Sequence, residues 1–104
     1  MKIDISKGFE LGGHSYRVDM SDNTREALIG KDCYGDHLGY QKIIRIANNI
    51  DIDQIRNTFL HECLEAVNQH CCNSKVKHDE ITNMANGLAQ ITKSLGIVFT
   101  TEEI

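Results

Sequence analysis

The residues of this chain whose types and spacing best suit metal chemistry lie in the stretch TFLHECLEAVNQH, residues 58–70. His61 and Glu65 are four residues apart. On a helix this spacing places both side chains on one face, one turn apart, where two ligands can reach one ion. Glu62 lies about 100° further around the helix from His61. It can lean towards the same ion without binding it, which is the position of a general base in a hydrolytic site.

A catalytic zinc ion needs a third protein ligand and an open position for water. His78 is the best candidate for that ligand, because it extends the apolar stripe of the next predicted helix by one turn, to the start of that helix. Antiparallel packing through a short connection would turn this face towards the first helix. His61, Glu65 and His78 then form a two-histidine, one-carboxylate set, the composition of a known class of catalytic zinc site.

Other interpretations of these residues stay open at this stage. His61 can be a partly buried helical histidine, with Glu62 and Glu65 on a solvated acidic face. His70 competes as a third ligand, but it lies roughly 13 Å beyond His61 along the helix axis. The same ligand set also suits iron in oxygen chemistry, because ligand identity alone does not choose the metal.

The remaining histidines and the cysteines are weaker candidates for a site. His14 and His37 fall in expected turns and are interpreted as surface residues. The four cysteines show neither C-x-x-C nor the paired spacings of structural zinc modules. Without a secretory signal they are expected to be reduced thiols. Cys63 falls on an apolar helix stripe and is expected to be a small buried apolar group.

Length and composition indicate what kind of protein would carry such a site. A chain of 104 residues, a quarter of them charged, is expected to form one domain (1–104) with a single core. No apolar run approaches the roughly 20 residues needed to span a bilayer, and the N-terminus lacks the apolar stretch of a signal peptide. These features predict a cytoplasmic protein. The net charge of −4 and the lack of a basic cluster argue against nucleic acid as a partner.

The first half of the chain is expected to form strands and turns. Gly12-Gly13 suits a two-residue hairpin turn, because both positions can take positive φ. A second hairpin is expected to end in a β-branched strand. The expected segments are strands at 2–5, 9–11 and 15–18, a short helical turn at 24–29, a hairpin arm at 33–34 and a strand at 42–47.

From residue 51 the apolar residues recur at intervals of three and four, which predicts helices. The first helix is expected to be capped by Asp51 or Asp53 and to fade at His70. Its stripe consists of Ile52, Ile55, Phe59, Cys63 and Val67. The second is expected to end at Gly96. Its stripe consists of Ile81, Met84, Ala85, Leu88, Ile91 and Leu95. Residues 97–100 can add a short strand. The predicted fold class is α+β: a small antiparallel sheet followed by two helices packed on one face.

The segments NTFLHECLEAVNQH and KHDEITNMANGLAQITKSLG resemble a family of small phage- and prophage-encoded proteins of the zincin type. These are minimal metallopeptidase-like domains related to the ImmA/IrrE group. The resemblance covers residues 42–95, and the N-terminal hairpins match in outline. It implies that His61 is the first metal ligand, Glu62 the catalytic base and His78 the third ligand. Glu65 occupies the second ligand position, where the family pattern has a histidine.

The resemblance implies a zinc-dependent metallopeptidase, with another divalent metal as an option. In such domains the strand before the active-site helix forms a sheet edge where an extended peptide can pair. Three residues are unranked candidates for stabilising the oxyanion: Tyr34, Tyr40 and His37. The alternative is a catalytically inactive zincin-like module that binds proteins through the same edge.

Overall fold

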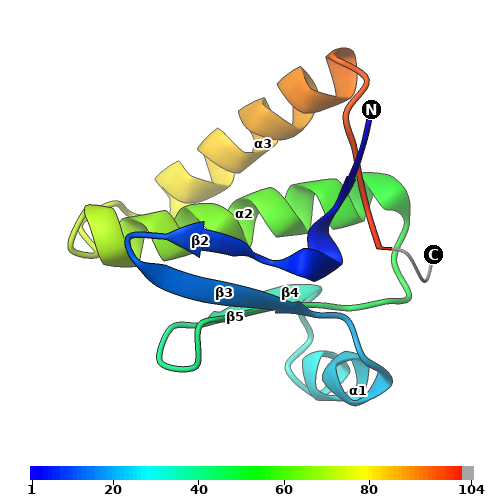
Figure 1. Cartoon of the computed structure of the whole chain (residues 1–104), viewed down its shortest axis with the longest axis horizontal. Helices are drawn as coiled ribbons and strands as arrows, with labels where there is room; N and C mark the ends of the chain where they lie inside the picture. The colour runs from blue at the N-terminus through cyan, green and yellow to red at the C-terminus, as the bar shows by residue number, and fades with distance from the viewer. Residues whose placement is uncertain (102–104) are drawn as a thin grey trace.

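The computed structural model describes residues 1–101 and has the predicted α+β class, with three helices and six strands in this part of the chain (Figure 1). The elements in chain order are β1 (Lys2–Asp4), the 3-10 turn η1 (Ile5–Lys7), β2 (Phe9–Leu11), β3 (His14–Asp19), α1 (Asp22–Gly30), β4 (Gly35–Leu38), β5 (Ile43–Ile46), α2 (Ile52–Cys71), α3 (His78–Ser94) and β6 (Val98–Thr100).

The strands form two small sheets, and the pairing is mixed rather than wholly antiparallel. The four-stranded sheet has the order β2-β3-β5-β4. The two hairpins, β2–β3 and β4–β5, are antiparallel as predicted, but β3 and β5 pair in parallel. β1 leaves this sheet and pairs in parallel with β6. Both parallel pairs join strands that are distant in the chain, so no local turn signal in the sequence could have predicted these pairings.

The hairpin turn at Gly12-Gly13 follows the sequence prediction. Gly12 has a φ of 58° and Gly13 a φ of 81°. The predicted strand at 9–11 is confirmed as β2, and the other predicted segments of this half differ from the structure at their ends. The expected helical turn is a full nine-residue helix, α1. The outer arm of the second hairpin is β4, residues Gly35–Leu38, rather than 33–34.

The elements are stacked in layers, with α2 between the four-stranded sheet and α3 (Figure 1). α1 lies on the opposite face of the sheet, where it packs on β5. The main core fills the space between α2 and the sheet. Its fully or largely buried members are Ile5, Tyr16, Ile44, Ile46, Ile55, Ala66 and Phe99.

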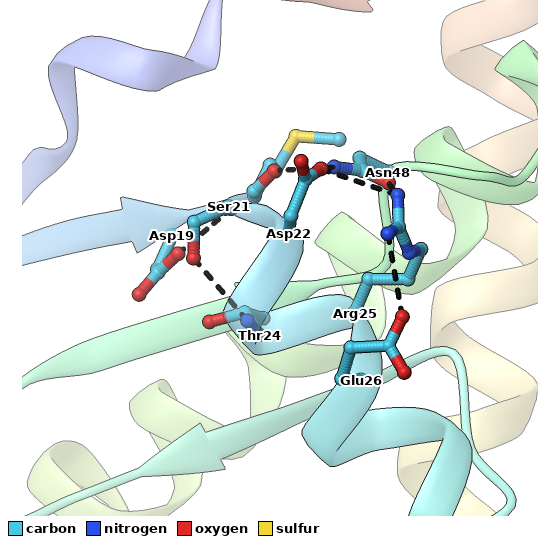
Figure 2. Close-up of polar contacts among 8 residues, drawn as sticks. Asp19, Ser21, Asp22, Thr24, Arg25, Glu26 and Asn48 are labelled. Atoms are coloured by element: carbon cyan, nitrogen blue, oxygen red, sulfur yellow. Dashed lines mark hydrogen bonds and ion pairs between the residues drawn. The ribbon is translucent and has the colours of Figure 1, made fainter.

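Side-chain caps define where the helices begin. Asp51 caps α2, because its carboxylate accepts a hydrogen bond from the Gln54 amide at 2.8 Å. Ser21 caps α1 in the same way through the Thr24 amide, at 3.2 Å (Figure 2). Asn48, just beyond β5, donates to the Asp22 carboxylate at 2.8 Å. This bond anchors the start of α1 to the end of the central strand.

The apolar stripe of α3 does not lie where the sequence pattern placed it. Ile81 and Ala85 are buried against α2, as expected. The rest of the predicted stripe is exposed by 38–70%, namely Met84, Leu88, Ile91 and Leu95. α3 is the outer layer and its main contacts are with α2. A single neighbouring helix can cover only a narrow line of residues.

The stripe of α2 needs a similar correction. Ile52, at the first position of the helix, is 50% exposed. The most buried line instead runs through Ile55, Thr58, Glu62 and Ala66, which face the sheet. A carboxylate therefore lies on the face of α2 that the hydrophobic pattern would reserve for apolar residues.

Candidate metal centre

The three residues predicted as metal ligands meet at one point between α2 and α3. His61, Glu65 and His78 each offer a ligand atom, and these three atoms lie within 4.8 Å of one another. The rings of His61 and His78 have their centres 5.0 Å apart. His78 Nδ1 lies 4.0 Å from a carboxylate oxygen of Glu65. The structure thus brings His61, Glu65 and His78 together, whereas His70, the competing third ligand, is not in this group.

Two different kinds of structure place these ligands. His61 and Glu65 share a face of α2 because they are one helical turn apart. His78 arrives through the six-residue connection between the helices. There the side-chain amide of Asn68 donates to the carbonyl of Val76 and its oxygen accepts from the Val76 amide, both at 3.0 Å. This two-way contact holds the connection against α2 and sets where α3 begins.

The ligand set fits a divalent ion such as zinc after a small adjustment. Zinc binds imidazole nitrogen and carboxylate oxygen at about 2.0–2.2 Å in a tetrahedron, so its ligand atoms lie about 3.4 Å apart. The spread of 4.8 Å must therefore close by about 1.4 Å. The His78 side chain is 74% exposed and has room to rotate inwards. Three protein ligands leave a fourth position open for water.

Partial burial prepares His61 for metal binding. Desolvation lowers the pKa of His61, an effect that the nearby Glu65 carboxylate partly opposes and that His78 reinforces. The neutral imidazole is thereby favoured, and this is the form that binds metal ions.

Glu62 lies against strand β4 rather than on a solvated face, and only 9% of its surface is exposed. Beside it, at Thr58, α2 comes so close to the sheet that residue 35 must be glycine. A Cβ at Gly35 would lie 2.4 Å from the Thr58 Cγ2, 2.8 Å from the Arg45 carbonyl oxygen and 3.7 Å from the Glu62 Cγ. The missing side chain lets α2 approach the sheet closely at this point.

Burial raises the pKa of Glu62 to about 7, with a further rise from the carboxylates of Glu65 and Asp36. A general base works best when its pKa is close to the operating pH, because it must both accept and release a proton. Glu62 therefore differs from an ordinary surface glutamate in the property that catalysis would require.

An open hollow of about 190 Å³ gives access to these groups. His61, Glu62 and His78 line it together with Tyr34 and Gly35 at the start of β4. A larger hollow of about 550 Å³ lies on the other side of Tyr34 and reaches Gln54 on α2. Both hollows include Tyr34 in their lining, so they adjoin each other at the N-terminal end of β4.

The other three histidines form a separate group around Tyr16. The Tyr16 hydroxyl lies 2.8 Å from Nε2 of His37 and 2.8 Å from Nε2 of His70. A hydroxyl has one proton to donate, so one of these imidazoles accepts and the other donates. The ring of His14 packs on that of His70, with centres 4.6 Å apart. His70 therefore does not join the candidate metal centre.

The expectation that His37 is a surface residue in a turn is wrong. His37 lies in β4 and is half-buried, because its strand position is paired with Ile44 and faces α2. Burial lowers the pKa of His37, and the Glu65 carboxylate opposes that shift. His14 is exposed as expected, although it starts β3 rather than lying in the turn.

The structure also shows where the candidate tyrosines and the cysteines lie. Tyr34 lines the hollow beside His61, whereas Tyr40 is fully exposed at 101%. The four cysteines are free thiols. Cys63 is partly buried rather than fully buried. Its burial raises the pKa of the thiol to about 12, which makes Cys63 unreactive.

Sequence reasoning missed two residues that shape the centre, Asn68 and Gly35. An asparagine in the last turns of a helix, before a polar connection, is only a weak signal that its side chain will hydrogen-bond to the backbone of that connection. Gly35 falls in the expected turn of the second hairpin, so its place in β4 carried no separate signal, although a glycine within a strand often marks close approach of another backbone.

Comparison of the chain with protein-family models, with curated protein sequences and with solved structures found no significant match. Within residues 1–101, none of the helices combines the length and the apolarity needed to cross a membrane.

Proposed function

We propose that this protein is a metal-dependent peptidase whose ion, zinc in the first instance, is held by His61, Glu65 and His78. The single observation that carries the proposal is the meeting of these three ligand atoms within 4.8 Å, beside a buried glutamate in the same hollow. The resemblance of the two helices to zincin-type domains supports the same assignment. We place the activity in the cytoplasm, where free thiols are the normal state.

Glu62 is the general base of the proposed reaction. An ion in the centre would supply Lewis acidity and make a bound water more acidic. Glu62 takes a proton from the attacking water and delivers it to the leaving nitrogen as the amide C–N bond breaks. The oxygen of the water stays on the carbonyl carbon, so the products are a carboxylic acid and an amine. Tyr34 is the best-placed donor to the developing oxyanion, because it lines the hollow.

An extended peptide is the substrate class that the surroundings favour. The strand directly before α2 is β5, which lies inside the sheet between β3 and β4, so the expectation that this strand forms the edge is wrong. The outermost strand on this side is β4, and in the described part of the chain its outer edge has no partner strand. Such an edge can pair with an added strand through main-chain hydrogen bonds. The two hollows extend along α2 from Glu62 to Gln54, about 12 Å by helix rise, which matches three to four extended residues.

Elemental analysis of the purified protein tests the metal centre. We expect one equivalent of zinc per wild-type chain, and its loss in His61→Ala and His78→Ala. His14→Ala is the matched control, because it removes an exposed imidazole outside the centre. Wild-type protein that takes up no zinc, cobalt or manganese from a metal-supplemented buffer would refute the centre.

Cleavage of a peptide library, followed by mass spectrometry, tests the reaction. We expect chelator-sensitive cleavage by the wild type and none by Glu62→Gln, which should still bind the ion. Glu10→Gln, an exposed carboxylate on β2, is the control for the charge change. If the ion binds but no peptide is cut, the alternative function, a non-catalytic module that binds peptides at the β4 edge, is favoured.

A further inference from the structure

The larger of the two hollows that adjoin at Tyr34 has a lining that the metal centre does not use. It measures about 550 Å³, a size typical of pockets that bind small ligands. Its lining comes from the end of α1, the connection from α1 to β4, the connection from β5 to α2 and the first turn of α2. The hollow is therefore a second cavity beside the proposed site of cleavage.

Most of this lining is apolar. Five of its nine residues have apolar or aromatic side chains, namely Ile29, Cys33, Tyr34, Ala47 and Ile50. Ile29 and Tyr34 are each 56% exposed, so their side chains are accessible to a ligand. Long basic side chains bury their methylene stem along apolar surface of this kind, while the charged end stays near water.

The charged part of the lining is wholly acidic. Asp32 and Asp51 are its two charged residues, and it contains no lysine, arginine or histidine. Within residues 1–101 neither carboxylate belongs to an ion pair, whereas Asp22, Asp36 and Asp53 each pair with a lysine or an arginine. The charges of Asp32 and Asp51 are therefore not neutralised by this part of the chain, and they make the potential in the hollow negative.

The backbone does not require a negative charge at either position. Asp32 has a positive φ of 54°, a conformation that asparagine adopts as readily as aspartate. Asp51 caps α2 through one carboxylate oxygen, which accepts from the Gln54 amide at 2.8 Å, and asparagine caps a helix equally well. Local folding therefore does not account for two charges in the lining of one hollow.

We propose that this hollow binds a lysine or arginine side chain of the peptide substrate, and that the protein cuts peptides close to a basic residue. The methylene stem lies on the apolar part of the lining, and the cationic end lies close to the carboxylates of Asp32 and Asp51. The ring of Tyr34 adds an aromatic surface, which also attracts cations. The inference rests on the proposed function and names its substrate class.

The position of the hollow along α2 limits the distance between the basic residue and the bond that is cut. The lining includes Gln54, which lies about 12 Å from Glu62 by helix rise. An extended chain covers this distance in three to four residues. The basic residue therefore lies within about four positions of the scissile bond, always on the same side of it.

Binding of paired peptides tests the preference. Each peptide is N-acetylated, so that a terminal ammonium group cannot replace the side chain, and carries one lysine in a neutral sequence. Its partner has norleucine at that position. We expect the zinc-loaded Glu62→Gln variant, which does not cleave, to bind the lysine peptide at least about fivefold more tightly in isothermal titration. Arginine should act like lysine, and the difference should shrink at high salt, which screens exposed charges.

Cleavage of an N-acetylated peptide library by the zinc-loaded wild type provides the second measurement. We expect lysine and arginine to be enriched at one fixed position near the cut, on one side of it only.

The double variant Asp32→Asn with Asp51→Asn removes both charges and keeps both backbone roles. Made in the Glu62→Gln background, it should bind the lysine and norleucine peptides within about twofold of each other. Its thermal stability should stay close to that of its parent, because asparagine suits both positions. Glu10→Gln in the same background is the matched control, an exposed carboxylate outside the hollow, and should keep the full preference.

The outcomes separate this inference from the peptidase activity. Lysine peptides that bind no better than norleucine peptides would overturn the inference, even if the wild type cleaves peptides. So would a preference for lysine that survives the loss of both aspartates. Preferential binding of lysine peptides by a protein that cleaves none would refute the peptidase proposal and support the site for a basic side chain.

Discussion

The side chain of Asn68 makes hydrogen bonds to both backbone groups of Val76, each at 3.0 Å. Asn68 belongs to α2, and Val76 lies two residues before His78. One amide therefore ties the start of α3 to the helix that carries His61 and Glu65.

Asn68→Ala is expected to loosen this connection and weaken metal binding at least tenfold. The two hydrogen bonds also contribute about 1–3 kcal/mol to stability, at about 0.5–1.5 kcal/mol each. Isothermal titration with Zn²⁺ and thermal unfolding of the metal-free protein measure the two effects. Asn23→Ala, an exposed asparagine of α1, should change neither. Unchanged zinc affinity in Asn68→Ala would show that the turn does not position His78.

Glu62 is expected to make the metal-free protein less stable at alkaline pH. Its pKa rises from the ordinary 4.5 to about 7 on folding. Its contribution to stability is therefore full below pH 4.5 and is lost as the pH rises through 7. Glu62→Gln should be more stable than the wild type at pH 8 by about 3.5 kcal/mol, since each pKa unit between 4.5 and 7 corresponds to about 1.4 kcal/mol.

Urea unfolding in the presence of a chelator, at pH 5 and pH 8, measures this difference. The gap between Glu62→Gln and the wild type should be much smaller at pH 5. Glu10→Gln should follow the wild type at both values. A gap of the same size at pH 5 and pH 8 would mean that ionisation of Glu62 is not its cause.

Gly35→Ala is expected to push α2 away from β4. Its Cβ would lie 2.4 Å from Thr58 Cγ2 and 2.8 Å from the carbonyl oxygen of Arg45, and the second of these is backbone. Overpacking of this kind costs about 1–3 kcal/mol. Peptide cleavage should fall as well, because a shift of α2 at Thr58 would also move Glu62, one turn further along the helix. Gly30→Ala, where an added Cβ meets nothing within 4 Å, should be neutral in thermal unfolding.

Asp36 and Arg45 form an ion pair on the face of the sheet that lies away from α2. Arg45 Nε donates to Asp36 at 2.7 Å, and this bond holds the pKa of Asp36 below its usual value. The resulting stability is present above about pH 4, the pKa of an unfolded aspartate, and is lost as the pH falls through the lowered folded value.

Asp36→Asn should therefore destabilise the protein at pH 7 by about 1.5–3 kcal/mol, the range for a charge-assisted hydrogen bond. The difference from the wild type should shrink as the pH approaches 2. Asp32→Asn, an exposed aspartate near the same hairpin, is the control. Equal destabilisation at pH 7 and pH 2 would argue that the ion pair is not responsible.

The sequence by itself determined the features that depend on neighbours along the chain. The four-residue spacing of His61 and Glu65 ensured that they share a face of α2, and Asp51 marked where that helix starts. Gly12-Gly13 predicted the first hairpin. These are local effects of backbone sterics, capping and helix period, and they need no knowledge of the rest of the fold.

Only the tertiary structure decided which faces are covered. The apolar pattern of α3 could not show that α2 takes the line through Ile81 and Ala85 and leaves Leu88 in solvent. Nor could the apolar pattern of α2 show that Glu62 would face the sheet, because this depends on how closely α2 packs against β4. The parallel pairing of β3 with β5 is of the same kind. Each of these results depends on contacts between distant segments, whose free energy is settled by the packing of the whole chain.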